Sequence, residues 1–230
     1  MTISIVIPTY NEAAHIEKLV RHLLRHKDEN VVEIIVTDGG SSDETFKIAG
    51  ETGAKAVQSP AKGRSVQLNY GASLAKGEVL YFIHADTFPP QTFCKDIATA
   101  IKKGFDMGRY TTKFLSRKPI LKLNEWFTHL DFFICMGGDQ TLFVKRKVFN
   151  ALNGFKKDML IMEEYEFCKR ARDSDAKYII MKGAAQVSAR KYEKNSWLQV
   201  QLANYKIVSM YKKGALPQSM AEQYKRMLKW

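Results

Sequence analysis

The stretch VLYFIHADT, residues 79–87, decides the fold, because a run of apolar residues ends abruptly in two polar side chains. Val79 to Ile83 form the pattern of a buried strand, and His84 and Asp86 follow at once. In α/β proteins, ligands bind just beyond the carboxyl ends of the strands. We therefore expect Asp86 to meet a polar ligand or its metal ion, although an Asp followed by Thr87 and two prolines is also typical of a turn.

Apolar strand patterns alternate with helical patterns through the first half of the chain. Strands are expected over residues 3–7, 31–36, 54–58 and 79–83. Helices are expected between Glu12 and Lys27 and over residues 45–53 and 63–75. This alternation predicts an α/β fold with a parallel sheet.

Polar side chains follow three of these strands, at Pro8 to Glu12, Asp38 to Asp43 and His84 to Asp86. Because the carboxyl ends of parallel strands meet at one edge of a sheet, we expect one nucleotide-sized site there. Asp38 is expected to accept hydrogen bonds from a base or ribose, and Gly39 lets the backbone approach closely. The chain has no GxGxxG and no GxxxxGK[ST] motif, so the dinucleotide-binding and P-loop classes have no motif support.

Four segments resemble the inverting family 2 glycosyltransferases of GT-A fold: IVIPTYNE at residues 5–12, DGGSSDET at 38–45, GRSVQLNYGASLAKGEVLYFIHADT at 63–87 and GGDQTLFVKRKVFNALNGF at 137–155. The chain is most similar to the short cytosolic subgroup associated with arsenosugar-type biosynthesis genes. The resemblance covers residues 3–195 and implies an α/β GT-A fold, with a mostly parallel central sheet flanked by helices. It places one GT-A domain over residues 1–195 and a C-terminal helical extension, packed on that domain, over residues 196–230.

The resemblance implies transfer of a sugar from a nucleotide-sugar donor, foremost a UDP-sugar, to an acceptor hydroxyl with inversion. It also implies a divalent cation, Mg²⁺ or Mn²⁺, held in the family by the two carboxylates of a strand-end DxD motif. Here the first position is His84, which leaves Asp86 as the main metal ligand and His84 as a candidate second ligand. A cation on the diphosphate stabilises the charge that develops on the leaving group.

The catalytic base of the family falls in the segment LIMEEYEFCKRAR, residues 160–172. Family members usually carry Glu-Asp there, whereas this chain has Glu163 and Glu164, so the resemblance assigns the base to Glu164, with Glu163 as the alternative. Adjacent residues do not share a helix face, so one of the two is expected to face the acceptor. Two solvated acids at a helix start are the ordinary alternative.

The resemblance also assigns contacts to the donor, the sugar and the diphosphate. Arg190 is expected to offset the charge of the leaving diphosphate. The loop of Gly137, Gly138, Asp139 and Gln140 is expected to line the donor sugar and the acceptor. The expected donor-binding residues are Pro8, Thr9, Tyr10, Glu12, Asp38, Gly39, Lys62, Arg64, Gln67, His84, Ala85 and Asp86.

The chain of 230 residues is strongly basic, with 36 Lys and Arg against 24 Asp and Glu and a net charge of +12. This excess favours nucleic acid, an anionic membrane surface or an anionic substrate. No nucleic-acid motif accompanies it, so we expect no nucleic-acid partner. Basic and aromatic residues alternate in the C-terminal part, which favours peripheral membrane contact. The apolar residues Leu198, Leu202, Tyr205, Val208 and Met210 predict a helix that docks on the domain, with an interfacial helix as the alternative.

Several classes of protein are disfavoured by the pattern. No apolar run approaches the roughly 20 residues that span a bilayer, and the chain starts with a strand pattern, so we expect a cytoplasmic protein that can meet the inner face of the membrane. Cys94, Cys135 and Cys168 lack CxxC spacing and predict reduced thiols. Two alternative functions stay open: a polyprenyl-phosphate sugar transferase at the membrane surface, and a non-catalytic nucleotide-sugar-binding module.

Overall fold

The computed structural model of the chain describes residues 1–132 and 141–229. Its elements in chain order are β1 (Ile3–Thr9), α1 (Ala13–His26), β2 (Val31–Asp38), α2 (Thr45–Glu51), β3 (Lys55–Gln58), α3 (Arg64–Leu74), β4 (Val79–Phe82), β5 (Thr87–Phe88), α4 (Phe93–Lys102), β6 (Met107–Leu115), α5 (Leu121–Phe127), β7 (Leu142–Lys145), α6 (Arg146–Ala151), α7 (Glu163–Asp173), β8 (Tyr178–Ser188), α8 (Arg190–Lys194), α9 (Trp197–Lys212) and α10 (Pro217–Met227).

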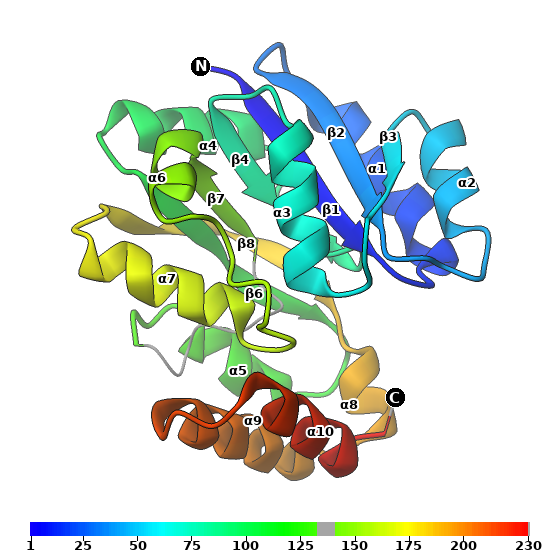
Figure 1. Cartoon of the computed structure of the whole chain (residues 1–230), viewed down its shortest axis with the longest axis vertical. Helices are drawn as coiled ribbons and strands as arrows, with labels where there is room; N and C mark the ends of the chain where they lie inside the picture. The colour runs from blue at the N-terminus through cyan, green and yellow to red at the C-terminus, as the bar shows by residue number, and fades with distance from the viewer. Residues whose placement is uncertain (133–140, 230) are drawn as a thin grey trace.

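The described strands form one sheet in the order β3-β2-β1-β4-β7-β6-β8-β5 (Figure 1). β1 is parallel to both β2 and β4, and β2 is parallel to β3, as the alternating pattern predicts. Beyond β4 the sheet is mixed, because β7 is antiparallel to β4 and β6, whereas β6 and β8 are parallel. The expected α/β fold with a mostly parallel sheet is confirmed.

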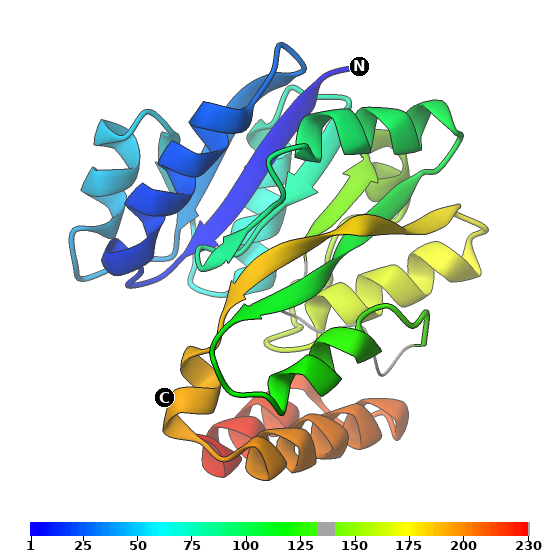
Figure 2. The same cartoon turned by 180° about the vertical axis from the view of Figure 1, so that it is seen from behind.

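Helices cover both faces of the sheet, and each face has its own apolar cluster. On one face, Ile3, Ile5 and Ile7 of β1 pack with apolar residues of α1, α2 and α4 (Figure 2). On the other face, Val6 of β1 packs with apolar residues of α3, α6 and α7 (Figure 1). This alternation along one strand is the period-two pattern of a strand covered on both sides.

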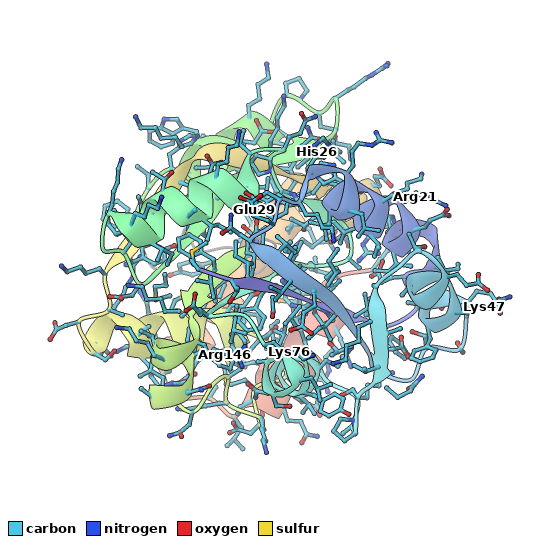
Figure 3. All side chains as sticks on the ribbon, turned by 90° about the horizontal axis from the view of Figure 1, so that it is seen from above. Arg21, His26, Glu29, Lys47, Lys76 and Arg146 are labelled. Carbon is cyan, nitrogen blue, oxygen red and sulfur yellow. The ribbon has the colours of Figure 1, made fainter. Side chains whose placement is uncertain are left out.

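The close approach of α3 to the sheet depends on Gly71. A Cβ atom at this position would lie 2.4 Å from Val6 Cγ1 and 3.0 Å from Thr37 Cγ2. The absence of a side chain therefore lets α3 lie directly on β1 and β2. At the far end of the molecule, seen from above in Figure 3, Arg146 holds the connection from α3 to β4, because its Nε donates to the carbonyl of Gly77 at 2.7 Å.

The C-terminal helices α9 and α10 pack below the sheet (Figures 1 and 2). Val200 and Ala203 of α9 lie in one apolar cluster with Phe114 of β6 and Val187 of β8. Ile207 and Val208 lie in another cluster, which holds Met159, Met162 and Met220. The extension therefore docks with only part of the predicted stripe: Val208 and Met210 pack in this cluster, whereas Leu198, Leu202 and Tyr205 are exposed. The domain boundary at residue 195 stays a prediction.

Two smaller predictions concern thiols and membrane spans. Cys94 and Cys168 are buried free thiols, as predicted, and Cys135 lies outside the described residues. Every helix within residues 1–132 and 141–229 is too short or too polar to cross a bilayer.

Replacement of Gly71 by Ala should lower the free energy of unfolding by about 1–3 kcal/mol, because the new methyl group overlaps Val6 and Thr37 in a filled core. The matched control is Gly50→Ala in α2, where a Cβ atom would have Ala56 Cβ as its neighbour at 3.9 Å. This control should raise stability by up to about 1 kcal/mol through helix propensity. Urea unfolding of both variants measures the two effects, and a Gly71→Ala protein as stable as the wild type would contradict the close approach.

Candidate functional site

The three predicted polar strand ends do meet at one edge of the sheet. Thr9, the last residue of β1, pairs with Asp38, the last residue of β2. On the other side of β1, Val6 pairs with Phe82 at the end of β4, two residues before His84. α3 and α7 begin at this same edge (Figure 1). Arg64 Nη1 of α3 donates to Glu163 Oε1 of α7 at 3.2 Å.

Asp38 is fully buried and organises the loop that follows β2. Its Oδ2 accepts hydrogen bonds from the backbone N–H groups of Gly40, at 3.0 Å, and Ser41, at 2.8 Å. Its Oδ1 accepts from the hydroxyl groups of Thr9 and Ser41. Both oxygens are thus engaged within the protein. Asp38 thus has a loop-forming role within the protein, and its direct contact with a base or ribose stays a prediction.

Gln67 likewise serves the frame of the site. Its Nε2 donates to the carbonyl oxygens of Thr9 at 2.7 Å and Thr37 at 2.8 Å, which ties the ends of β1 and β2 to α3. A Cβ atom on Gly39 would lie 2.9 Å from Gln67 Oε1, so Gly39 is needed for this fit. Both N–H groups of its amide are used in this bridge, and the contact of Gln67 with a donor stays a prediction.

Sequence reasoning assigned no role to the side chains that lock the first two loops together. Asn11 N donates to Ser41 Oγ at 2.9 Å, and Ser42 N donates to Asn11 Oδ1 at 2.9 Å. Glu12 N donates to Thr45 Oγ1 at 2.8 Å. The run of turn-forming residues after β2 was the available signal. These bonds fix the position of Glu12 at this edge of the sheet.

Arg190 binds two carboxylates from different strand ends. Its Nη2 lies 2.7 Å from Glu12 Oε1, and its Nη1 donates to Glu12 Oε2 at 3.0 Å. Its Nε lies 3.2 Å from Asp86 Oδ2. The guanidinium group is half-exposed, and the two carboxylates are mostly buried. Arg190 therefore brings a positive charge to the place where the ends of β1 and β4 meet.

His84 and Glu164 form a buried pair, with His84 Nε2 at 3.0 Å from Glu164 Oε1. Burial raises the pKa of Glu164, and the neighbouring Glu163 adds to this, while His84 and Arg64 act in the opposite direction. Burial is the largest single influence on His84 and lowers its pKa, but the charge and hydrogen bond of Glu164 together with the charge of Asp86 outweigh it, so the pKa of His84 is raised. The Glu164 carboxylate, which lies near the end of β4, is therefore a stronger base than an ordinary carboxylate.

Glu163 points to a different partner from Glu164, as expected for adjacent helix residues. It is buried, and its Oε1 receives the hydrogen bond from Arg64. Its Oε2 is buried with no hydrogen-bond partner among the described residues. Met162, just before the pair, has a left-handed backbone with φ of 69° and packs on α9 and α10 through Ile207, Val208 and Met220. The C-terminal helices thus support the start of α7.

The remaining predicted residues are placed as follows. Tyr10 is exposed, and Lys62 Nζ lies 3.6 Å from the centre of its ring. Pro8 and Ala85 are buried beside the edge. The predicted sugar and acceptor loop of Gly137, Gly138, Asp139 and Gln140 lies outside the described residues.

Asp86 is the residue best suited to a divalent cation. Within residues 1–132 and 141–229, no cluster of three His, Cys, Asp or Glu side chains forms a complete metal site. Mg²⁺ in phosphate sites is usually held by one or two carboxylates, and the substrate supplies further oxygen ligands. Arg190 Nε lies 3.2 Å from Asp86 Oδ2, so the other carboxylate oxygen of Asp86 is the one that fits such a shared site. His84 stays a candidate second ligand, and because its Nε2 contacts Glu164, its Nδ1 is the nitrogen that would be left for a cation.

Comparison with known proteins identifies the family and the fold of the chain. Residues 4–151 match the model of glycosyl transferase family 2. The dolichol-phosphate mannosyltransferase of Pyrococcus furiosus is 31% identical over 113 residues, which are 47% of this chain and 32% of that protein. The glucosyl-3-phosphoglycerate synthase of Mycobacterium tuberculosis is 33% identical over 99 residues, which are 39% of this chain and 30% of that protein. The chain thus spans about a third of the length of these curated relatives.

Solved structures show the same fold. Staphylococcus aureus TarS in complex with UDP-GlcNAc has a TM-score of 0.68 at 18% identity, over 83% of this chain and 59% of that chain. The M. tuberculosis glucosyl-3-phosphoglycerate synthase in complex with Mn²⁺, UDP and glucosyl-3-phosphoglycerate has a TM-score of 0.65 at 20% identity, over 93% of this chain and 80% of that chain. These likenesses support the expected GT-A fold. The arsenosugar subgroup stays a prediction.

Replacement of Asp38 by Ala should lower the free energy of unfolding by about 1–3 kcal/mol, because the N–H groups of Gly40 and Ser41 lose their acceptor. The control is Glu44→Ala, which removes an exposed ion pair with Lys47 and should change stability by less than about 0.5 kcal/mol. Chemical denaturation measures both. A stable Asp38→Ala protein that has lost nucleotide affinity would contradict the loop-forming role and support the predicted direct contact.

Proposed function

Because the chain belongs to glycosyl transferase family 2, we propose that it transfers a sugar from a nucleoside-diphosphate sugar to an acceptor hydroxyl, with inversion at the anomeric carbon. One observation carries this proposal: a buried carboxylate, Glu164, is hydrogen-bonded to His84, two residues from Asp86, at the strand ends where ligands bind in α/β folds. Such a transfer needs a base and a group that binds the anionic diphosphate, and the positions of Glu164 and Arg190 support these two roles.

Glu164 is the proposed base that takes the proton of the attacking hydroxyl group. A positioned general base contributes roughly 10²- to 10⁴-fold to the rate. His84 holds the Glu164 carboxylate by a hydrogen bond from Nε2, which limits the directions in which the carboxylate can point. Arg64 holds Glu163 in the same way, so the two acids have separate partners. This separation supports Glu164 over Glu163 as the base.

Arg190 and Asp86 are the proposed binding groups for the diphosphate. Arg190 is the first residue of α8, two residues after the end of β8. Its guanidinium group is half-exposed, so phosphate oxygens can approach it. Asp86 would hold a Mg²⁺ or Mn²⁺ ion together with the diphosphate. Such an ion, when bound, neutralises charge on the leaving group. A UDP-sugar is the proposed donor, in keeping with the UDP ligands of the structural relatives.

The acceptor distinguishes the main proposal from its alternative. Similarity to a dolichol-phosphate mannosyltransferase and to an undecaprenyl-phosphate 4-deoxy-4-formamido-L-arabinose transferase of Pseudomonas fluorescens, 34% identical over 142 residues, favours a lipid phosphate as the alternative acceptor. Transfer of labelled sugar into a lipid-phosphate-containing membrane extract, against transfer to soluble hydroxyl compounds, separates the two. A non-catalytic binding module would bind UDP-sugar without transferring it or hydrolysing it. A cytoplasmic location remains part of the proposal.

Glu164→Gln should lower the single-turnover rate of sugar transfer by roughly 10²- to 10⁴-fold and leave UDP affinity within about twofold of the wild type, because it removes the proton acceptor and keeps the side-chain size. When no acceptor is added, water takes its place, and the release of UDP from UDP-glucose or UDP-N-acetylglucosamine in the presence of Mn²⁺ measures the rate. Glu163→Gln is the matched control and should lose less. A larger loss for Glu163→Gln would move the base to Glu163, and normal turnover of both variants would exclude a base at the start of α7.

We expect the transfer rate to fall at acidic pH, with a midpoint above the pKa range of an ordinary carboxyl group. The ionised form of Glu164 is the active one, so the rate rises as pH increases through its raised pKa. His84→Gln removes the positive neighbour and should move this midpoint to higher pH. Glu163→Gln removes a negative neighbour and should move it to lower pH. Rate profiles of the three proteins measure the midpoint, and shifts in the same direction for both variants would contradict the assignment.

A further inference from the structure

Large apolar side chains are exposed mainly at one end of the molecule. Fifteen large hydrophobic residues of the described chain are exposed, and ten of them lie within residues 115–132 and 198–216. The opposite end, seen in Figure 3, presents charged side chains that include Arg21, Lys47 and Lys76. Scattered exposed apolar residues are ordinary, whereas a group of them at one end indicates an interaction surface.

Helix α9 is apolar on two sides. One side, with Val200, Ala203 and Ile207, is buried against the rest of the protein. The other side presents Leu198, Leu202 and Tyr205, which are 60%, 53% and 65% exposed. These three residues follow the i, i+4, i+7 spacing of a single helix face. Docking to the domain therefore uses only one of the two apolar sides of α9.

Helix α5 lies beside α9 and also has exposed apolar side chains. The two helices are joined by a hydrogen bond of 2.6 Å from Trp197 Nε1 to Asn124 Oδ1, and both lie at the front in the lower part of Figure 2. On α5, Leu123, Trp126 and Phe127 are 42%, 57% and 42% exposed. We call these three residues together with Leu198, Leu202 and Tyr205 the α5–α9 patch.

The chain around the α5–α9 patch is strongly basic. Residues 113–132 contain four Lys and Arg and two acids, and residues 194–216 contain four Lys and no acid. The two segments thus carry a net charge of +2 and +4, which is half of the +12 of the whole chain. Both acids are already engaged, because Glu125 accepts a hydrogen bond from Phe114 N and Asp131 pairs with Arg172. All eight basic residues are exposed: Lys113, Arg117, Lys118, Lys122, Lys194, Lys206, Lys212 and Lys213.

We propose that the α5–α9 patch binds the surface of an anionic lipid bilayer, with its aromatic and Leu side chains in the interface and the surrounding Lys and Arg near the lipid headgroups. Exposed Trp, Phe, Tyr and Leu flanked by Lys and Arg match the chemistry of such an interface. Self-association through this surface would bring two strongly positive surfaces together, which is unfavourable. The proposal needs neither a bound donor nor turnover, so it stands apart from the proposed reaction.

Co-sedimentation of the full chain with vesicles tests the proposal. We expect the chain to bind vesicles of phosphatidylcholine mixed with phosphatidylglycerol, and to bind vesicles of phosphatidylcholine alone at least about tenfold more weakly. Leu202→Ser with Tyr205→Ser should weaken binding to the mixed vesicles by about tenfold or more, and Trp126→Ser with Phe127→Ser should do the same. Phe46→Ser on α2, 37% exposed and remote from the patch, is the matched control and should bind like the wild type.

Near-ultraviolet circular dichroism of each variant shows whether it is folded, so that loss of binding is assigned to the surface. Quenching of tryptophan fluorescence by lipids with brominated acyl chains, in a Trp197→Phe and Trp230→Phe background, reports directly on Trp126. Quenching is expected. Binding that depends on phosphatidylglycerol but is unchanged in both double variants would show a purely ionic contact elsewhere and overturn the proposal. Absence of vesicle binding would overturn it as well, as would a concentration-dependent dimer that both double variants abolish.

Discussion

The parallel pairing of β1 with both β2 and β4 is the constraint on which the rest of the site depends. It sets Thr9 beside Asp38 and leaves the end of β4 on the other side of β1. Three loops therefore leave the sheet at one edge. Gly71 lets α3 lie on β1 and β2, and from there Gln67 ties Thr9 and Thr37 together. The positions of Glu12, His84 and Asp86 follow from this frame, which the buried side chains of Asp38 and Gln67 stabilise.

Charge at this edge is arranged in pairs that cross between elements. Glu12 and Asp86 share Arg190, Glu163 pairs with Arg64, and Glu164 pairs with His84. Burying a carboxylate is costly unless it is paired and hydrogen-bonded, so each pair permits a buried acid that would otherwise be neutral or exposed. The pairs also separate two tasks. The pair of Arg190 and Asp86 is suited to an anionic leaving group, and the pair of His84 and Glu164 to a proton.

Local patterns in the sequence predicted β1, α1, β2, α3 and β4 and the polar residues that follow the strands, because each depends on neighbouring residues. They did not predict that β6 would pair in parallel with β8, whose partners are about 70 residues apart. The partners of Asp38, Gln67 and His84 were also missed, because a side chain's hydrogen bonds depend on elements that only the fold brings together. His84 illustrates this limit: its place in a metal motif suggested a ligand, and the structure pairs it with Glu164.

The assignment of the strand-end edge to a nucleoside diphosphate and its cation is tested most directly by calorimetry of UDP binding, with and without Mn²⁺, to the wild type and to Asp86→Asn. The wild type should bind UDP more tightly when Mn²⁺ is present. Asp86→Asn should lose this gain and keep its affinity for UDP alone, because Arg190 remains held by Glu12. Equal Mn²⁺ dependence in the two proteins would contradict the assignment of the cation to Asp86, and no UDP binding by the folded wild type would contradict the site itself.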